Sequence, residues 1–311
     1  MPNPFRFGVQ CGHCDGGAAG WAALARKAEE LGYSTFTMGD HLDAQFSPTV
    51  GLMAAAAATS TIRIGALTYA NDYHHPVVLA KEAATLDLLS DGRLELGIGA
   101  GWMTSDYEQA GIPLDPPGTR IDRLAEAVTI LKGLFADGRV DFHGDHYEVH
   151  GLEGSPKPVQ RPHPPLLIGG GGRRILSLAA READIVGLNF NLHGGRIDAS
   201  VGPDGTAEHT AEKIGWIREA AGDRFDQIEL HTRIHLALVT DDRAGMADAL
   251  APAFGLSPAD ALASPHALCG NVDEIVDDLL EMREHLGIAS IGLSLDALEA
   301  FAPIVARLAD A

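Results

Sequence analysis

The sequence predicts an α/β fold, a (β/α)8 TIM barrel with loop insertions. Short apolar runs alternate with amphipathic helical segments eight times along the 311 residues, and no linker separates two halves. A doubly wound sheet fits this even, uninterrupted alternation less well. We therefore expect residues 1–311 to form a single barrel domain.

The N-terminal half supplies four strand–helix units. Each predicted strand is a short apolar run, and each predicted helix carries apolar residues three or four positions apart. The strands are expected at Phe5–Val9, Ser34–Gly39, Ile62–Leu67 and within "SDGRLELGIGAG". The helices that follow are expected at Trp21–Leu31, Leu52–Ala58, Leu79–Leu86 and Leu124–Leu134, and Gly32 ends the first of them.

The C-terminal half supplies the other four units and most of the insertions. Strands are expected at Pro165–Ile168, Ile185–Leu188, Leu230–Val239 and Ser290–Leu295, and a last helix at Leu298–Leu308. Residues 140–165 resemble a hairpin with a proline-rich tether, and residues 191–205 and 253–270 form two further insertions. Because loops after barrel strands surround the active site, the last two are candidate lids.

Composition excludes several classes of partner. The net charge of −20 opposes phosphate backbones and anionic lipids, and no Lys/Arg-rich tract offsets it. Three cysteines, no apolar run long enough for a bilayer and no charged-then-apolar N-terminus favour a cytoplasmic protein. We expect a homodimer with a small-molecule substrate and neither nucleic-acid nor membrane partners.

The segment "LLIGGGGRRIL" predicts an anion site. A buried strand runs into four glycines, two arginines and a helical face that begins at Ile175. Glycines let backbone N–H groups approach a phosphate, and the helix N-terminus adds its dipole. The alternative is a tight strand-to-helix turn without a ligand. In "LGIGAG", the glycines either approach a ligand or make room for a neighbouring group.

Several histidines are candidate functional residues. Asp40 and His41 follow the second strand, where a barrel places catalytic groups, although a structural histidine fits equally well. His75 precedes Pro76 and is expected to cap or pack a helix. Another group is His143, His146 and His150. Their spacing does not match a helical zinc pair, so we expect no metal site.

The segment "CGHC" has the spacing of a redox dithiol. Such a dithiol needs a helix directly after its first cysteine, but "DGGAAG" follows Cys14 and postpones the helix to about Trp21. We therefore expect a loop at the barrel mouth and no redox role. The residues that we expect to line the substrate pocket are Cys11, His13, Trp102 and Asn189.

Six segments follow one another along the chain in this order: Asp40-His41, "LTYANDYHHP", "LAKEAATLDLLSDGRLELGIGAGW", "AGIPLDPPGTRIDRLAEA", "PKPVQRPHPPLLIGGGG" and "LAAREADIV". With them the chain resembles the luciferase-like monooxygenase superfamily, and most of all its coenzyme F420-dependent oxidoreductases. The match runs from Phe5 to about Val186, and "VDEIVDDLLEMREHLGIASIGLS" is similar as well.

This resemblance implies that the cofactor ring lies across the strand ends. It would rest against a bulge that carries a non-proline cis peptide bond, which we place at Gly65–Ala66. The expected cofactor-binding residues are Asp40, Gly65, Ala66, Thr68, Gly99, Gly101, Gly170, Gly171, Gly172, Arg173, Arg174 and Ile175.

The resemblance also bears on the reaction. His41 matches the catalytic histidine of sugar-phosphate dehydrogenases in the superfamily. Trp102 replaces their acidic residue, which argues against a sugar phosphate, and His74 stands where many relatives have arginine. We expect hydride transfer between F420 and a small organic substrate, with His41 moving the proton. The alternatives are an FMN-dependent monooxygenase and a flavin-binding protein without catalysis.

Overall fold

The computed structural model describes residues 3–192 and 194–309. Within these ranges, parallel strands form a closed barrel, because β3 pairs with β2 on one side and with β5 on the other. The barrel strands are β1 (Arg6–Gln10), β2 (Thr35–Met38), β3 (Arg63–Ala66), β5 (Leu94–Gly99), β8 (Leu166–Gly170), β9 (Ile185–Leu188), β10 (Glu229–Arg233) and β13 (Ile288–Ser294). The predicted barrel is confirmed.

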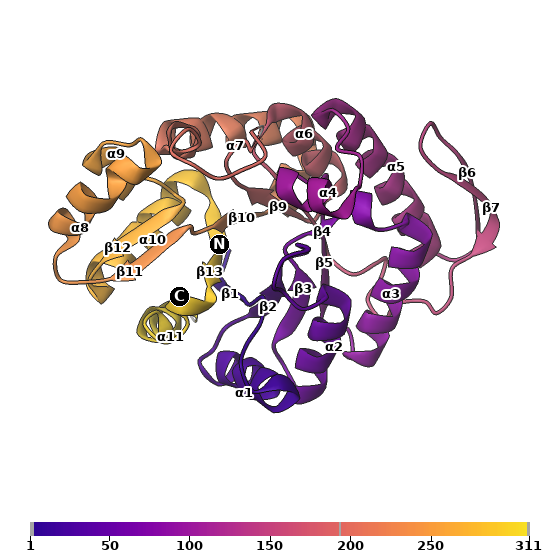
Figure 1. Cartoon of the computed structure of the whole chain (residues 1–311), viewed down its shortest axis with the longest axis horizontal. Helices are drawn as coiled ribbons and strands as arrows, with labels where there is room; N and C mark the ends of the chain where they lie inside the picture. Colours follow the sequence, from indigo (N-terminus) through magenta and orange to yellow (C-terminus); the bar gives the residue numbers. More distant parts are fainter. Residues whose placement is uncertain (1–2, 193, 310–311) are drawn as a thin grey trace.

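Helices surround the strands, as Figure 1 shows. They are α1 (Gly17–Glu30), α2 (Pro48–Ala58), α3 (Pro76–Leu89), α5 (Pro117–Phe135), α6 (Arg173–Glu182), α7 (Ala207–Ala221), α10 (Val272–Leu286) and α11 (Ala302–Leu308). Helix α1 begins three residues after Cys14, earlier than the predicted start near Trp21. None of the helices within the described ranges is both long and apolar enough to cross a membrane.

Helix α10 illustrates how the sequence sets these elements. The side chain of Asn271 accepts the N–H of Glu274, and the Glu274 carboxylate accepts the N–H of Asn271, which satisfies two donors at the helix start. The helix ends at Gly287, whose φ of +72° suits a residue without a Cβ. Ile275 and Leu279 lie on the face buried in the core.

Charged side chains close the N-terminal end of the barrel. Arg6 of β1 donates to Glu229 of β10 at 2.8 Å and also pairs with Glu95 of β5. Arg63 of β3 donates to the same Glu95 at 2.6 Å. This ionic network joins strands around the barrel at the end opposite to the loops that follow the strands.

The bulge after β3 lies two residues later than predicted. The cis peptide bond is Leu67–Thr68, followed by the short strand β4 (Tyr69–Ala70). The prediction of a cis bond at Gly65–Ala66 is wrong, because both residues are still paired with β2 in regular register. The chain departs from the strand only after Ala66. A Cβ on Gly97 would lie 2.0 Å from the Ala66 carbonyl oxygen, so β5 needs glycine there.

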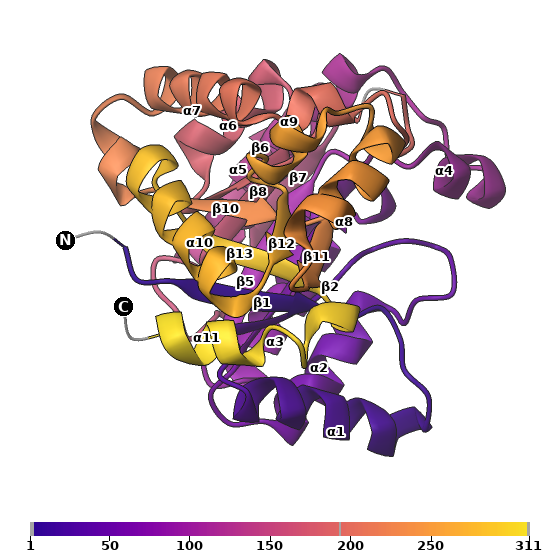
Figure 2. The same cartoon turned by 90° about the vertical axis from the view of Figure 1, so that its left-hand side faces the viewer.

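The predicted strand Leu230–Val239 divides into two. β10 ends at Arg233, and the N–H of His235 bonds to the carbonyl of His266 outside the barrel. The chain continues as β11 (Leu236–Val239), which pairs in parallel with β12 (Ala267–Gly270). Helices α8 (Arg243–Leu250) and α9 (Pro258–Leu262) accompany this pair, and Figure 2 shows the group beside the barrel.

The insertions occupy three separate places. Residues 140–165 form the predicted hairpin, β6 (Arg139–His143) and β7 (Glu148–Glu153), followed by the tether. Residues 253–270 supply α9 and β12, and residues 191–192 and 194–205 belong to a loop that ends in a short 3-10 helix. His193 of that loop lies outside the described residues. Helix α4 (Thr104–Ala110) follows β5.

Candidate functional site

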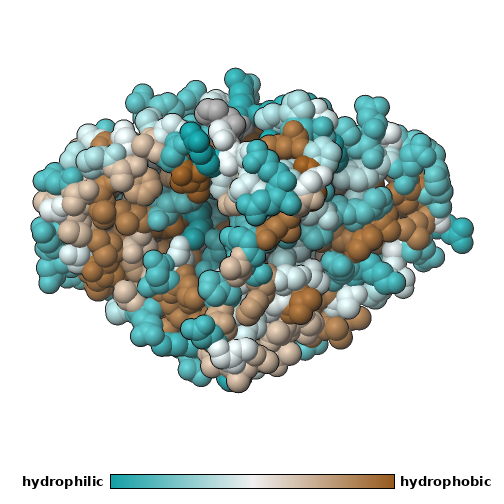
Figure 3. Space-filling view, in the orientation of Figure 1, coloured by the Kyte–Doolittle hydropathy of each residue, from teal (hydrophilic) through white to brown (hydrophobic). Residues whose placement is uncertain are grey.

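A cleft of about 1040 Å³ opens at the C-terminal ends of the barrel strands. Its size reaches the upper end of the range of small-molecule sites, roughly 300–1,000 Å³. Figure 3 shows the hollow near the centre of this face of the molecule. Residues at or just after the ends of several barrel strands line it, among them Gln10, Asp40, His41, Gly99, Gly170 and Arg233.

His41 is paired with a carboxylate. Its Nδ1 lies 2.8 Å from Oδ2 of Asp106, which comes from α4. A carboxylate only accepts, so Nδ1–H donates to it and Nε2 remains for a ligand in the cleft. The Asp106 side chain is 5% exposed and that of His41 is 21% exposed. His41 therefore faces the cleft while Asp106 supports it from behind.

A second carboxylate–histidine pair holds Asp40. Its Oδ2 accepts the backbone N–H of Ala70 at 2.9 Å and lies 2.8 Å from Nε2 of His74. Asp40 thereby ties the residues after β2 to the segment that follows the cis bond. His74, which stands where many relatives have arginine, thus contacts Asp40. His75 caps α3 by accepting the N–H of Val77, as predicted.

The glycine segment after β8 forms a narrow cradle. A Cβ on Gly171 would lie 2.3 Å from the carbonyl group of Phe190, so the two backbones meet closely. Gly172 is the N-cap of α6 and has no side chain to cap the first-turn N–H groups. These donors, together with the helix dipole, are available to an anion in the cleft. Gly170, Gly171 and Gly172 all line the cleft.

Both arginines of the cradle are paired at its rim. Arg173 donates to Glu219 at 2.8 Å, and Arg174 pairs with Asp122 of α5. All four side chains are more than half exposed. Arg173, Arg174 and Ile175 line the cleft, so the arginines reach an anion there only in competition with these carboxylates.

A buried arginine holds the loop after β5. Arg120 donates to the carbonyl oxygens of Ala100, at 3.2 Å, and of Gly101. Gly99 and Gly101 make room for neighbours, since a Cβ on Gly99 would lie 2.6 Å from Oγ1 of Thr68. Both glycines still line the cleft, as does Thr68. The next residue, Trp102, meets the His41 ring edge-on at 5.6 Å.

Two of the predicted sets need correction. Gly65 and Ala66 are strand residues and do not line the cleft, whereas Leu67 and Thr68 after them do. Of the expected substrate-pocket residues, His13, Trp102 and Asn189 line the cleft. Cys11 does not, because its side chain is fully buried in the core.

The pKa values of the two thiols in "CGHC" are shifted in the opposite direction from those of a redox-active pair. Burial, with a smaller contribution from Cys14, raises the pKa of Cys11 to about 12. Desolvation also raises the pKa of Cys14 above its ordinary value. A redox-active thiol needs a lowered pKa, so this environment disfavours thiolate chemistry.

Neutral histidines and a partly buried arginine lie on the β10 side of the cleft. Burial lowers the pKa of His231 and of His235 to about 3 each. Burial also lowers the pKa of Arg233 to about 10, and its guanidinium donates to the carbonyl of Gly292 and to Ser294. His231, Arg233 and His235 all line the cleft, and none of the three appeared among the predicted site residues.

The hairpin histidines lie elsewhere. His143 and His150 share a face of the exposed β6–β7 hairpin with Glu148, and their ligand atoms lie within 4.8 Å of one another. All three side chains are exposed to solvent, and none lines the cleft.

Sequence reasoning also missed Asp106 and Arg120, which line the cleft and hold His41 and the loop after β5. Asp106 lies 65 positions after His41, and only the fold brings them together. Arg120 is a polar residue on the buried face of α5, and this break in the apolar pattern was the available signal.

Comparison with known proteins agrees with this geometry. The family model described as luciferase-like monooxygenase matches residues 6–254. The uncharacterized protein Rv0953c of Mycobacterium tuberculosis is 34% identical over 187 residues, which cover 52% of this chain and 65% of that protein. The FMNH(2)-dependent dimethylsulfone monooxygenase of Pseudomonas putida is 31% identical over 174 residues, covering 54% of this chain and 48% of that enzyme.

These curated relatives extend beyond the matched region, since the chain spans less than two thirds of their length. Among solved structures, the coenzyme F420 dependent tetrahydromethanopterin reductase from Methanopyrus kandleri superposes with a TM-score of 0.78, covering 98% of this chain and 100% of that one. At 18% identity this likeness concerns the fold alone. The family model, in contrast, covers most of the chain. The chain therefore belongs to the luciferase-like monooxygenase family.

Proposed function

We propose that this protein is an F420-dependent oxidoreductase that transfers a hydride between the deazaflavin and a small organic substrate. The chain belongs to the luciferase-like monooxygenase family, whose description supports an oxidoreductase. The observation that carries the proposal is the His41–Asp106 pair at the cleft floor. Hydride transfer to or from a carbon–oxygen bond needs a proton moved at the oxygen, and a carboxylate-backed imidazole suits that task near neutral pH.

The cleft fits a tricyclic ring with a ribityl phosphate. The uncapped start of α6 offers N–H donors to the phosphate, and the cradle there admits only glycine at position 171. Leu67, Thr68 and Ala70 present the segment around the cis bond to the cleft, where a ring would rest. When bound, the reduced deazaflavin supplies a hydride and reacts slowly with oxygen.

The residues of this chain then have three tasks. Asp106 orients the His41 ring through Nδ1, so that Nε2 exchanges a proton with the substrate oxygen. Asp40 holds the chain after the cis bond through the N–H of Ala70. Trp102, edge-on to His41, covers the histidine and limits water around the proton that moves.

FMN-dependent monooxygenation is the second candidate. It is favoured by the 31% identity to an FMNH(2)-dependent monooxygenase. Both cofactors offer a ring, a ribityl chain and a phosphate, so the cradle accepts either to some degree. The difference is the anionic tail of F420, which would leave along the rim that carries Arg173 and Arg174.

A parallel titration of the purified protein with oxidised F420 and with FMN tests the choice. We expect F420 to bind at least about tenfold more tightly, since one or two charge-assisted contacts to the tail supply about 1.4 kcal/mol. Salt should narrow the difference because it screens the tail. Tighter binding of FMN, with oxygen consumed by the reduced complex and a substrate, would establish the monooxygenase instead.

A further inference from the structure

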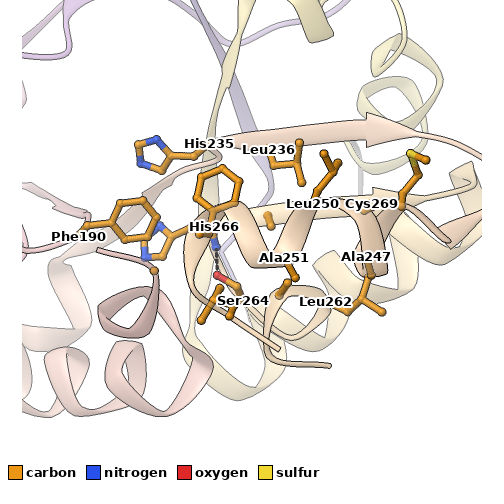
Figure 4. Close-up of a pocket in the computed structure, with 16 residues that line it drawn as sticks. Phe190, His235, Leu236, Ala247, Leu250, Ala251, Leu262, Ser264, His266 and Cys269 are labelled. Carbon is orange, nitrogen blue, oxygen red and sulfur yellow. Dashed lines mark hydrogen bonds between the residues drawn. The ribbon is translucent and has the colours of Figure 1, made fainter. Parts of the chain in front are cut away.

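A second pocket lies beside the cleft, in the part of the chain outside the barrel. Figure 4 shows a row of side chains between the β11–β12 pair and helices α8 and α9, with aromatic rings gathered at one end. Within the described residues its lining is almost entirely apolar and includes Leu236, Met246, Ala247, Leu250, Leu262 and Cys269. Figure 3 shows hydrophobic surface over the same region.

Two residues line both this pocket and the cleft. They are Phe190, which follows β9, and His235, which follows β10. Their rings stack with centroids 4.5 Å apart and planes at 23°. Asn189 fixes the outer edge of the stack, since its side-chain oxygen lies 2.9 Å from Nε2 of His235. The stacked pair is thus the boundary between the two spaces.

The boundary carries no charge near neutral pH. Burial lowers the pKa of His235 to about 3 and that of His266, on the pocket side, to about 4. The Ser264 hydroxyl, the other polar group at this end, donates to the carbonyl of Gly205. An apolar group in the pocket therefore meets neutral rings and a satisfied hydroxyl, while Nε2 of His266 is buried without a hydrogen-bond partner among the described residues.

The pocket is small. The volume in which the centre of a water-sized atom fits without overlapping the protein is about 40 Å³. At roughly 10–15 Å³ for each such atom, this is room for about three atoms. Apolar walls hold water poorly, so the natural occupant is an apolar group. Phe190 and His235, which line both spaces, place the cleft directly beside it. A short unbranched alkyl chain matches both the size and the lining.

We propose that this pocket binds a short unbranched alkyl tail of the substrate while the reacting group lies in the cleft. The inference rests on the proposed function for the identity of the reacting group, but the pocket itself is testable without a cofactor. The substrate class is then a small aliphatic compound with a carbon–oxygen head, and Phe190 and His235 select for an unbranched chain.

Binding of straight-chain 1-alkanols, from ethanol to 1-octanol, to the cofactor-free protein tests this directly by ligand-observed NMR. Each added methylene should tighten binding about fourfold until the pocket is full, after which affinity should level off. Ala247→Leu fills the pocket and should flatten the dependence on chain length. Ala249→Leu is the matched control, because it makes the same change at an exposed position of α8.

Either of two results overturns the proposal. In the first, the affinity of the wild type for alkanols does not depend on chain length. In the second, the dependence is the same in the wild type and in Ala247→Leu. Thermal unfolding of both variants checks that they fold. Failure of the proposed function looks different: neither F420 nor FMN binds, while alkanols still show the plateau. If a cofactor binds and turnover occurs but chain length has no effect, this inference alone fails.

Discussion

Mild acid should destabilise this protein through its buried histidines. His231 and His266 are both buried, and burial lowers their pKa values to about 3 and about 4 from 6.5. In the unfolded chain each takes up a proton near pH 6.5, whereas the folded protein keeps both neutral. Their contribution to stability is therefore complete above pH 6.5 and is lost as the pH falls from there towards 3 to 4.

The magnitude follows from the difference in bound protons. Between pH 7 and pH 5 the unfolded state gains about 0.7 proton at each histidine and the folded state gains almost none. Integration over this range gives a loss of about 2 kcal/mol for each histidine. The two together should lower the free energy of unfolding by about 4 kcal/mol, a large part of the roughly 5–15 kcal/mol of a typical domain.

Urea unfolding at pH 7 and pH 5 measures this loss. His231→Gln removes one titrating group, so the difference between the two pH values should shrink by about 2 kcal/mol, whatever the variant does to stability at pH 7. His285→Gln is the control, because His285 is exposed near the end of α10. Equal acid sensitivity in His231→Gln and the wild type would refute the reasoning.

Two further predictions concern the cleft, and a third concerns the dithiol. Asp106→Asn should lower kcat/KM about 10- to 100-fold with cofactor affinity unchanged, because a charge-assisted hydrogen bond to His41 contributes about 1.5–3 kcal/mol. Asp43→Asn removes another carboxylate of the cleft and is the control. Equal effects in both variants would contradict a specific role of Asp106. Arg174→Ala should weaken cofactor binding by about tenfold or less, whereas Asp122→Asn, which frees Arg174, should tighten it. Calorimetric titration that finds no change in either variant would remove the contact between Arg174 and the anionic part of the cofactor. Cys11→Ala with Cys14→Ala should leave kcat unchanged in a steady-state assay, because the pKa values of both thiols are raised, and a loss of turnover with cofactor still bound would restore a thiol mechanism.

The pattern of apolar residues and glycines along the sequence predicted the strands and helix starts that depend on neighbouring residues alone. The apolar run Ile185–Leu188 has the bounds of β9, and the glycine segment before Arg173 becomes the N-cap of α6. Leu230–Val239 shows the limit of such a prediction, because the sequence of this segment does not reveal that its second half pairs with β12, a strand of four residues inside an insertion. The pairing partner, and not the strand itself, was missing from the pattern.

The candidate site shows the same division. Asp40 and His41 were predicted from their place after a strand, and both line the cleft. Asp106 has no local signal, since its role depends on a contact with His41 across 65 positions. Cys11 was expected in the pocket because of its neighbours in sequence, but strand alternation turns its side chain into the core.

The ionic network of Arg6, Glu95, Arg63 and Glu229 has a consequence for how ligands enter and leave the cleft. It joins the strand ends at the base, so a molecule that enters the cleft from the rim also leaves by the rim. When two ligands share such a blind recess, the one that lies deeper must arrive first and depart last. Under the proposed function, a ring-bearing cofactor that lies deeper than the substrate should therefore add first and leave last, and initial-rate patterns and product inhibition measure that order.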